Sequence, residues 1–324
     1  MTIAAEELLA PIADDLREFE RRISASIAAD LGPMAEAMEH VVKAGGKRLR
    51  PALVILSGRL GNAARDEVFN IAMGIEFIHT ATLVHDDLID DSPTRRGIRT
   101  IHEALGANPA IIIGDYYFAK GANLLSEIGQ PAIDSAISNA VMTICLGELL
   151  QMMSRRNYDQ TLDDYYSKIE RKTATLLSTC CYTGGLAGQL DTGGVEVLRR
   201  YGYLLGMAFQ IADDVLDYKA TSAEVGKPVG ADLRQGTVTL PLMLALEDPA
   251  VAPRLRQVLD KKDLNDADYL TVVEAVRSSS AIAEAERHAR EFADKARAEL
   301  QPFPPSESKH TLERICEYVV ERRI

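Results

Sequence analysis

The placement of the prolines limits what this chain of 324 residues can fold into. No proline occurs between Pro51 and Pro93, and none occurs between Pro131 and Pro228. Proline interrupts helices because it lacks a backbone N–H and clashes with the preceding turn. Both proline-free stretches carry apolar residues three and four positions apart, which is the spacing of a buried helix face. The stretches therefore predict a succession of helices.

Signals for helix starts and stops divide these stretches into separate helices. Pro131 suits the first turn of a helix, and Thr161 with Asp164 has the residue types of an N-terminal capping pair. The pairs Ser92-Pro93 and Gly184-Gly185 are expected to end the helices before them. The helices predicted in this way span about residues 66–91, 131–155, 162–184 and 195–218.

Strand signals are missing from the sequence. No segment alternates polar and apolar residues at period two, so we expect no strand. The stretches 261–267 and 302–305 have the composition of surface loops rather than of domain linkers. We therefore expect an all-α fold in which residues 1–324 form a single domain.

The charge balance is acidic, with 48 Asp and Glu against 36 Lys and Arg and a formal net charge of −12. Nucleic-acid binding requires a basic surface, so no nucleic-acid partner is expected. No apolar run approaches the roughly 20 residues that span a bilayer, and the acidic start does not resemble a signal peptide. The four cysteines show no metal-ligand or disulfide spacing. A cytoplasmic protein without stable membrane insertion is the expectation.

Two similar aspartate clusters lie among apolar residues, DDLID at 86–90 and DDVLD at 213–217. Positions i and i+4 share one face of a helix, so the first and last acids of each cluster point the same way. Such like charges are destabilising unless something neutralises them. One cluster would also fit a solvated acidic turn, but two clusters in apolar helices favour a metal site. Carboxylates suit Mg²⁺, which binds through one or two of them together with substrate phosphates.

Basic residues occur where a diphosphate held at these clusters would need them. Arg95 and Arg96 closely follow the first cluster, and segment 45–51 reads GGKRLRP. Glycines allow the backbone to approach a ligand closely, and arginines chelate phosphate oxygens. A basic pair alone more often serves solubility. Together with both acidic clusters, these pairs favour a diphosphate site.

The motifs, in this order and spacing, resemble those of the trans-prenyltransferases, or polyprenyl diphosphate synthases. Their residues are most similar to those of the octaprenyl type. The resemblance is strongest over residues 45–241. It rests on GGKRLRP (45–51), HDDLIDDSPTRRG (85–97), KTA (172–174), GMAFQIADDVLD (206–217), GKPVGADL (226–233) and TLP (239–241). It implies an isoprenoid synthase-like helical bundle with a deep central cavity, usually a homodimer.

The resemblance also implies roles for individual residues. Asp86, Asp90 and Asp213 would hold three Mg²⁺ ions, for which Mn²⁺ can substitute. Supporting or water-mediated roles would fall to Asp87, Asp214 and Asp217. The substrate-binding residues would be Lys47, Arg50, His79, Arg95, Arg96, Lys172, Gln210 and Lys227. The developing cation would face Gln210 and the backbone of Lys172 and Thr173.

The implied reaction joins isopentenyl diphosphate head to tail to an allylic diphosphate. Metals and cationic side chains stabilise the departing diphosphate, so that the allylic C–O bond ionises. Positioning alone holds the carbocation against the isopentenyl double bond. One departure concerns Thr237, where many relatives carry lysine. The corresponding phosphate contact is either missing or supplied elsewhere, with Arg234 as the candidate.

Product length in this family depends on side chains below the first aspartate cluster. Shorter-chain enzymes often place an aromatic residue four or five positions before it, where this chain has Thr82 and Ala81. Five helical residues span roughly 7.5 Å, and small residues at that depth leave room for an all-trans product of about C40–C50. The expected starter is of the farnesyl or geranyl type. A product of about C15–C25 is the alternative, if a deeper side chain forms the floor.

Other functions share part of the pattern. A class I terpene cyclase usually lacks segment 45–51 and lines its pocket with aromatic residues, whereas this chain has no Trp and 6% aromatics. A non-catalytic subunit tends to lose one aspartate cluster, and both are present here. Arg322 and Arg323 near the C-terminus are interpreted as a frayed helix end with favourable charge rather than as a lid.

Overall fold

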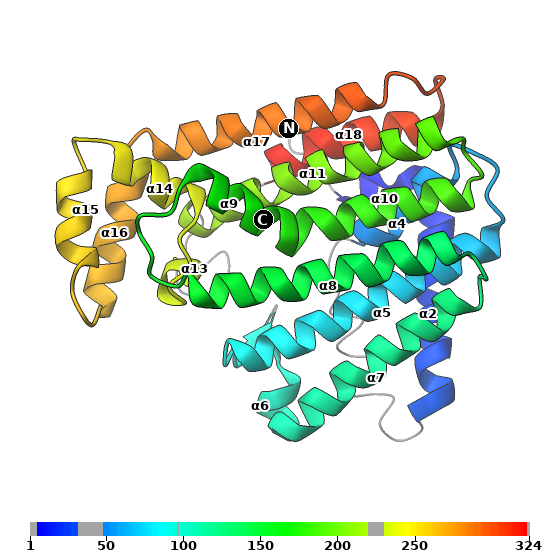
Figure 1. Cartoon of the computed structure of the whole chain (residues 1–324), viewed down its shortest axis with the longest axis horizontal. Coiled ribbons are helices and arrows are strands. Elements are labelled where there is room, and N and C mark those ends of the chain that lie inside the picture. Colours follow the sequence, from blue (N-terminus) through cyan, green and yellow to red (C-terminus); the bar gives the residue numbers. More distant parts are fainter. Residues whose placement is uncertain (1–4, 32–47, 96, 220–229, 323–324) are drawn as a thin grey trace.

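The computed structural model describes residues 5–31, 48–95, 97–219 and 230–322, and their regular structure is almost entirely helical (Figure 1). In chain order the elements are α1 (Ala5–Leu8), η1 (Ala10–Ile12), α2 (Ala13–Leu31), α4 (Leu49–Gly58), α5 (Arg65–Ile89), β1 (Thr94–Arg95), β2 (Ile98–Arg99), α6 (Ile101–Leu105), α7 (Ala107–Ser126), α8 (Pro131–Met153), α9 (Leu162–Ile169), the π-helical turn η3 (Glu170–Ala174), α10 (Thr175–Ala187), α11 (Thr192–Lys219), α13 (Ala231–Arg234), α14 (Leu240–Glu247), α15 (Ala252–Leu259), α16 (Asp266–Ser278), α17 (Ala281–Glu299) and α18 (Glu307–Glu321). The all-α prediction is confirmed.

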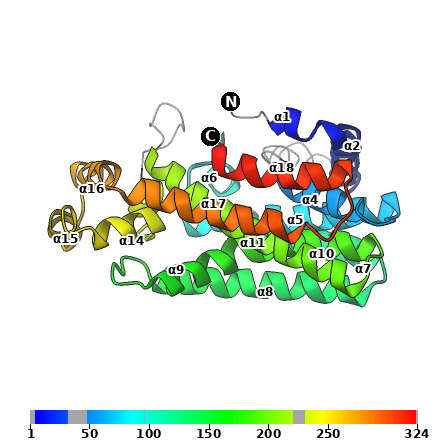
Figure 2. The ribbon, with the colours of Figure 1, turned by 90° about the horizontal axis from the view of Figure 1, so that it is seen from above.

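The long helices run side by side along the long axis of the molecule. Figure 1 shows α5, α8, α10, α11 and α17 in this arrangement, with α14, α15 and α16 grouped at one end. The view from above places α17 and α18 on one side of the bundle and α8 on the opposite side (Figure 2). Helices α5 and α11 both end toward the group formed by α13 to α16, and this shared end holds the two aspartate clusters.

Two packed groups of apolar side chains form the core of the described residues. The first joins α4, α5, α7 and α10, and the rings of Phe77 and Tyr117 stack within it with centroids 5.7 Å apart. The second lies where the last turns of α11 meet α14, α16 and α17, around the fully buried Tyr218. Helix α11 contributes to both groups, so it fixes its aspartate cluster relative to the rest of the bundle.

Most predicted helix starts agree with the structure. Pro131 opens α8, and α5 ends just before Asp90. The capping box before α9 is also present, because Thr161 N donates to Oδ2 of Asp164 at 3.0 Å and Asp164 N donates to Oγ1 of Thr161 at 3.2 Å. Local sequence signals determine these ends, which is why sequence reasoning found them.

Two details of the predicted secondary structure differ in the structure. The helix expected to break near Gly184-Gly185 continues slightly further and ends at Ala187. Gly184 faces α4, where a Cβ atom would lie 2.5 Å from the carbonyl oxygen of Val54, so glycine serves close helix packing here. The structure also contains a short antiparallel hairpin, in which Arg95 of β1 pairs with Ile98 of β2. Two-residue strands are too short to show alternation.

Two of the described helices, α5 and α8, are long and apolar enough to cross a membrane by length and composition alone. This differs from the expectation that no apolar run approaches that length. In α5, 72% of the apolar window is buried, as in the core helix of a soluble protein. In α8 only 28% is buried, and the helix lies at the edge of the bundle (Figure 2).

Candidate active site

The first aspartate cluster closes the C-terminal end of α5. Asp87 is buried, and its Oδ1 accepts a hydrogen bond from Nε of Arg95 at 2.8 Å. Asp90 is the C-terminal cap of the helix, and its Oδ1 accepts one from Nη2 of Arg155 at 2.9 Å. Arg95 reaches the cluster from the β1–β2 hairpin, and Arg155 reaches it from the loop after α8. Two arginines therefore neutralise two of the acids that follow Asp86, namely Asp87 and Asp90.

Asp86 is half-buried and lies near a lysine–glutamate pair. Nζ of Lys172 donates to Oε1 of Glu148 at 2.7 Å. Burial, and after it the carboxylate of Glu148, raises the pKa of Asp86 to about 6, against the opposing effects of Lys172 and Arg95. A carboxylate in this state is stabilised by any further cation that binds beside it. Sequence reasoning missed Glu148, because a single glutamate on a helix carries no signal.

Asp213 is the exposed member of the second cluster, on α11. Its Oδ1 accepts a hydrogen bond from Nη2 of Arg322 at 2.9 Å. The same guanidinium donates to the carbonyl oxygen of Phe209 at 3.2 Å and lies 3.9 Å from the centroid of the Phe209 ring. The side chain of Arg322 is only 7% exposed. The interpretation of this arginine as part of a frayed end was therefore wrong, while Arg323 lies outside the described residues.

Asp214 and Asp217 lie deeper on α11. The buried Asp214 accepts hydrogen bonds from the hydroxyl of Tyr165 at 2.7 Å and from Nε2 of Gln210 at 2.8 Å. Asp217 accepts bonds from two backbone N–H groups of α13, including that of Asp232 at 3.2 Å. Burial, followed by the charge of Asp232, raises the pKa of Asp214 to about 8 and that of Asp217 to about 7. Both carboxylates are thus held where a proton or a cation stabilises them.

Asp232, on α13, connects the two clusters. Burial and the carboxylate of Asp213 raise its pKa, and Asp90 adds to this effect, whereas Lys172 and Lys168 lower it. The charges of Asp90 and Asp213 can both affect the pKa of Asp232 only when the two clusters lie close together. The structure therefore brings the two predicted clusters to one site, at the end of the bundle where α5, α11 and α13 meet (Figure 1). Sequence reasoning missed Asp232, although it lies within the GKPVGADL motif.

Lys172 and Thr173 lie on η3, which interrupts the helix predicted after Thr161. A π-helix widens the turn by one residue and is frequent at functional sites. Oγ1 of Thr173 donates to Oε1 of Gln210 at 2.5 Å, which links η3 to α11. Burial lowers the pKa of Lys172, but the charge and hydrogen bond of Glu148, together with the charges of Asp86 and Asp232, outweigh burial, so the net shift is upward. Lys172 is therefore charged at the centre of the site.

Two glycines let neighbouring helices approach η3 closely. A Cβ on Gly147 of α8 would lie 2.7 Å from Cβ of Arg171. A Cβ on Gly206 of α11 would lie 2.4 Å from Cα of Ala174. Real Cβ atoms are not found at such distances, so η3 fits between α8 and α11 only because both positions are glycine.

A preformed metal cage is not present among the described residues, where no three His, Cys, Asp or Glu side chains converge closely enough to hold an ion. The metal ligands Asp86, Asp90 and Asp213 therefore remain a prediction. The chemistry of the donor set fits a hard divalent cation, because several crowded carboxylates of raised pKa lose their repulsion when one binds. Mg²⁺ completes its shell with water and substrate phosphates and needs only one or two carboxylates.

Arg50, predicted to bind isopentenyl diphosphate, is the second residue of α4. Burial lowers its pKa against the opposing charge of Glu76, and its Nε has no hydrogen-bond partner within the described ranges. A buried donor without a partner is what an anionic ligand would satisfy. His79 is half-buried on α5. The remaining predicted substrate residues, Lys47, Arg96 and Lys227, lie outside the described residues.

Ala81 and Thr82 lie on α5 below the first cluster. Ala81 is fully buried, whereas Thr82 is half-buried and donates its hydroxyl to the carbonyl oxygen of His79 at 2.8 Å. Ala81 follows Ile78 by three positions and precedes His85 by four, so the three share one helix face. Ile78 and His85 both contact glycines of α7. The small side chain of Ala81 therefore lies on the α5 face that is turned toward α7.

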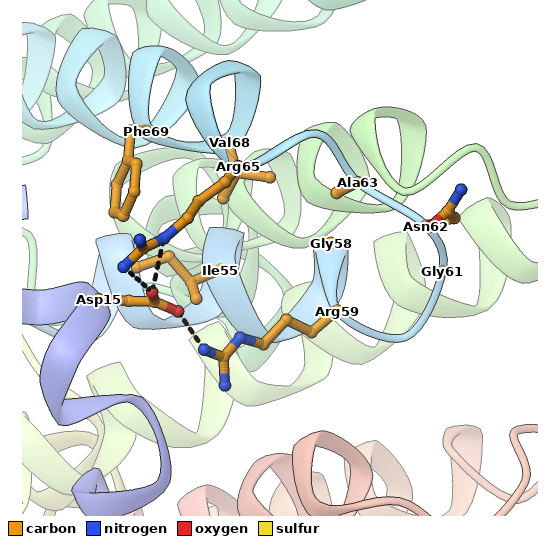
Figure 3. Close-up of a pocket in the computed structure, with 10 residues that line it drawn as sticks. All are labelled: Asp15, Ile55, Gly58, Arg59, Gly61, Asn62, Ala63, Arg65, Val68 and Phe69. Atoms are coloured by element: carbon orange, nitrogen blue, oxygen red, sulfur yellow. Dashed lines mark hydrogen bonds and ion pairs between the residues drawn. The ribbon is translucent and has the colours of Figure 1, made fainter.

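A cavity of about 290 Å³ lies near the opposite end of α5, between α2 and α4 (Figure 3). Figure 3 shows Asp15 between Arg59 and Arg65, and its Oδ1 accepts a hydrogen bond from Nη2 of Arg65 at 2.8 Å. Arg65 begins α5 and Asp86 lies near its end, so a rise of 1.5 Å per residue places them roughly 30 Å apart. This cavity is therefore separate from the aspartate site.

Two carboxylate clusters at one end of an all-α bundle, with the charged Lys172 beside them, are the arrangement that the resemblance to the polyprenyl diphosphate synthases implies. The sequence model of the polyprenyl synthetase family matches residues 33–276. The chain belongs to this family, and it is a prenyl diphosphate synthase.

Similar proteins of known sequence or structure span the chain almost entirely. The heptaprenyl diphosphate synthase component 2 of Geobacillus stearothermophilus is 35% identical over 96% of this chain and 97% of its own length. The octaprenyl diphosphate synthase of Escherichia coli (strain K12) is 33% identical over 96% of both chains. A polyprenyl synthase from Caulobacter crescentus CB15, complexed with calcium and isoprenyl diphosphate, covers 100% of this chain and 99% of its own, with 33% identity and a TM-score of 0.93. These relatives agree with the long-chain enzyme that the sequence predicted.

Proposed function

We propose that the protein condenses isopentenyl diphosphate with an allylic diphosphate and releases an all-trans polyprenyl diphosphate of about C40–C50. The observation that carries this proposal is the joint site of both aspartate clusters. At this site the charges of Asp90, from the first cluster, and of Asp213, from the second, both raise the pKa of Asp232. Relatives named as heptaprenyl, octaprenyl and decaprenyl diphosphate synthases support a long product. The small side chain of Ala81 supports it as well, because it adds no bulk at that depth below the cluster.

The metal of this proposal is Mg²⁺, three ions per site, with Asp86, Asp90 and Asp213 as ligands and Mn²⁺ as a substitute. The crowded carboxylates support a divalent ion, as does the calcium-bound relative from Caulobacter crescentus. Bound metal supplies charge neutralisation for the departing diphosphate.

The protein's own residues position the reactants around that leaving group. Lys172 and Arg95 would hold the allylic diphosphate, since both lie beside Asp86 and both are charged. The amide of Gln210 is fixed in one orientation, because it accepts from Thr173 and donates to Asp214. Its carbonyl oxygen would then face the carbocation without rotating. No side-chain base is needed, because the released diphosphate can accept the proton.

We also propose that the protein is a cytoplasmic homodimer whose two copies meet through one exposed apolar face of α8. This face consists of Met142, Leu146, Leu149 and Met153, which follow one another at helical spacing and are 52–84% exposed. A single chain seldom leaves such a face uncovered, and a two-fold axis places the same face of a second copy against it. Covering it would also remove the apolar surface that a membrane would otherwise attract.

Incubation of the purified protein, without any other chain, tests the reaction. The assay contains Mg²⁺, radiolabelled isopentenyl diphosphate and farnesyl diphosphate, and the dephosphorylated products are separated by length. Products near C40–C50 are expected, whereas products of C15–C25 would support the enzyme class but refute the long-chain assignment. The absence of incorporation with every allylic starter would favour a subunit that needs a partner, as the name "component 2" of one relative suggests for that protein.

Light scattering during size-exclusion chromatography tests the dimer. The wild type is expected to elute with twice the mass of its 35.4 kDa chain. Leu146→Glu places a charge in the centre of the α8 face and should give a monomer. A monomeric wild type, or a dimer that survives the charge, would refute the assignment of this face.

A further inference from the structure

Lys168, the penultimate residue of α9, is a buried lysine to which no family motif assigns a role. The residue is 8% exposed, and its Nζ donates to the carbonyl oxygen of Val238 at 2.6 Å. Val238 directly follows Thr237, the position where many relatives carry lysine. The ammonium group of Lys168 therefore lies beside the backbone from which the expected lysine is missing.

The ammonium group has hydrogen-bonding capacity left over. It carries three N–H donors, and Val238 is its one hydrogen-bond acceptor among the residues that the structure describes. A buried cation is costly unless its donors are satisfied. Burial lowers the pKa of Lys168, and the charges that act on it most are those of Asp214, Asp232 and Lys172. Lys168 thus faces the aspartate site with donors available for an anion.

The alternative candidate, Arg234, is directed elsewhere. Its Nη1 donates to Oδ1 of Asp266 at 2.5 Å, and its guanidinium lies 4.7 Å from the centroid of the Tyr269 ring. Both partners belong to α16 and neither is an aspartate of the site. Most of the Arg234 guanidinium is thus engaged by α16, and its buried Nε is left without a hydrogen-bond partner among the described residues.

We propose that Lys168 contacts the diphosphate of the allylic substrate in place of the lysine that relatives carry at the position of Thr237. Lys168 and Lys172 lie four residues apart, across the junction of α9 and η3, and both act on Asp232. The pair would bind the diphosphate from one side, while Arg95 binds it from the first cluster. This inference rests on the proposed function and names one further substrate-binding residue for it.

Steady-state kinetics of four variants test this role. They are Lys168→Met, Lys168→Arg, the double variant Lys168→Met with Thr237→Lys, and Arg234→Met as a control. Loss of a charged hydrogen bond should lower kcat/KM for the allylic diphosphate of Lys168→Met about 10- to 100-fold. The KM for isopentenyl diphosphate should stay within about twofold, as should all constants of Arg234→Met. Lys168→Arg keeps the charge and should retain most of the activity.

The double variant separates substrate binding from a structural role. A lysine at position 237 should raise kcat/KM for the allylic diphosphate at least about tenfold above that of Lys168→Met, because it returns a cation to the same site. Calorimetric titration with inorganic pyrophosphate and Mg²⁺ should show the same loss and recovery of affinity. If Lys168→Met fails to fold, the double variant decides the matter through its pyrophosphate affinity.

Three results would overturn the role of Lys168 while leaving the proposed function intact. The first is a Lys168→Met variant with kinetics like those of the wild type. The second is an equal loss for both substrates without recovery in the double variant. The third is a double variant that folds but binds pyrophosphate no better than Lys168→Met. A wild type that incorporates no isopentenyl diphosphate would instead overturn the proposed function itself.

Discussion

A single methyl group added at Gly206 should damage catalysis far more than stability. Gly206 lies on α11 against η3, the turn that carries Lys172 and Thr173. An added Cβ would lie 2.4 Å from Cα of Ala174, whereas ordinary contacts begin at 3.4 Å. Backbone atoms cannot rotate away as a side chain does, so Gly206→Ala must displace η3 by about 1 Å.

The expected magnitudes follow from that displacement. Overpacking of a close contact costs about 1–3 kcal/mol, but alanine also favours a helix over glycine by about 1 kcal/mol. The free energy of unfolding should therefore fall by only about 0–2 kcal/mol. A misplacement of about 1 Å at a reacting centre can cost about 100-fold in rate. We expect kcat to fall by that order while the protein remains folded.

Urea unfolding and the radiolabelled prenyl-transfer assay measure the two effects. Gly193→Ala in the first turn of the same helix is the matched control, since the nearest atom to its added Cβ is Oδ1 of Asp191 at an ordinary 3.5 Å. The control should keep full activity and lose no stability. A Gly206→Ala variant with wild-type kcat would refute the argument that η3 depends on this contact. So would an equal loss in both variants.

Three further predictions concern the acids, the product and the metal. In metal-free buffer, the free energy of unfolding should fall between pH 4 and 8, because Asp214 has a pKa of about 8 when folded and 3.8 when unfolded, so the folded state binds more protons in this range. Asp214→Asn should flatten this fall in urea titrations, and an unchanged slope would contradict the assignment. Ala81→Phe should shorten the products on chain-length analysis, because the ring adds bulk at the depth below the first cluster; an unchanged length would show that the chain passes elsewhere. Removal of Mg²⁺ with EDTA should abolish incorporation while the helical circular dichroism persists, because an apolar core holds the bundle; unfolding on chelation would contradict this.

The features that sequence predicted depend on neighbours in the chain. Proline spacing located α5 and α8, and the capping pair at Thr161 located the start of α9. The two aspartate clusters were predicted from their i and i+4 spacing, which a helix turns into a shared face. These signals need no knowledge of tertiary structure, so they survived comparison with it.

The features that sequence missed arise from contacts between distant segments. Glycine at position 184 suggests a helix break, yet it serves close packing against α4, which lies far away in the chain. Asp232, Glu148 and Lys168 join the site only because α8, α9 and α13 meet there. The π-helical turn η3 depends on glycines of two other helices, and no local pattern predicts it.

The arginines at the aspartate clusters have a consequence for how the enzyme would acquire its metal. Arg155 pairs with Asp90 and Arg322 pairs with Asp213, so predicted metal ligands on both clusters already hold a cation of the protein. Binding of Mg²⁺ is then an exchange of one cation for another. A diphosphate that arrives with its metal can receive the displaced guanidinium groups on its own oxygens. Loading of the enzyme should therefore follow the concentration of the metal–diphosphate complex more closely than that of the free ion.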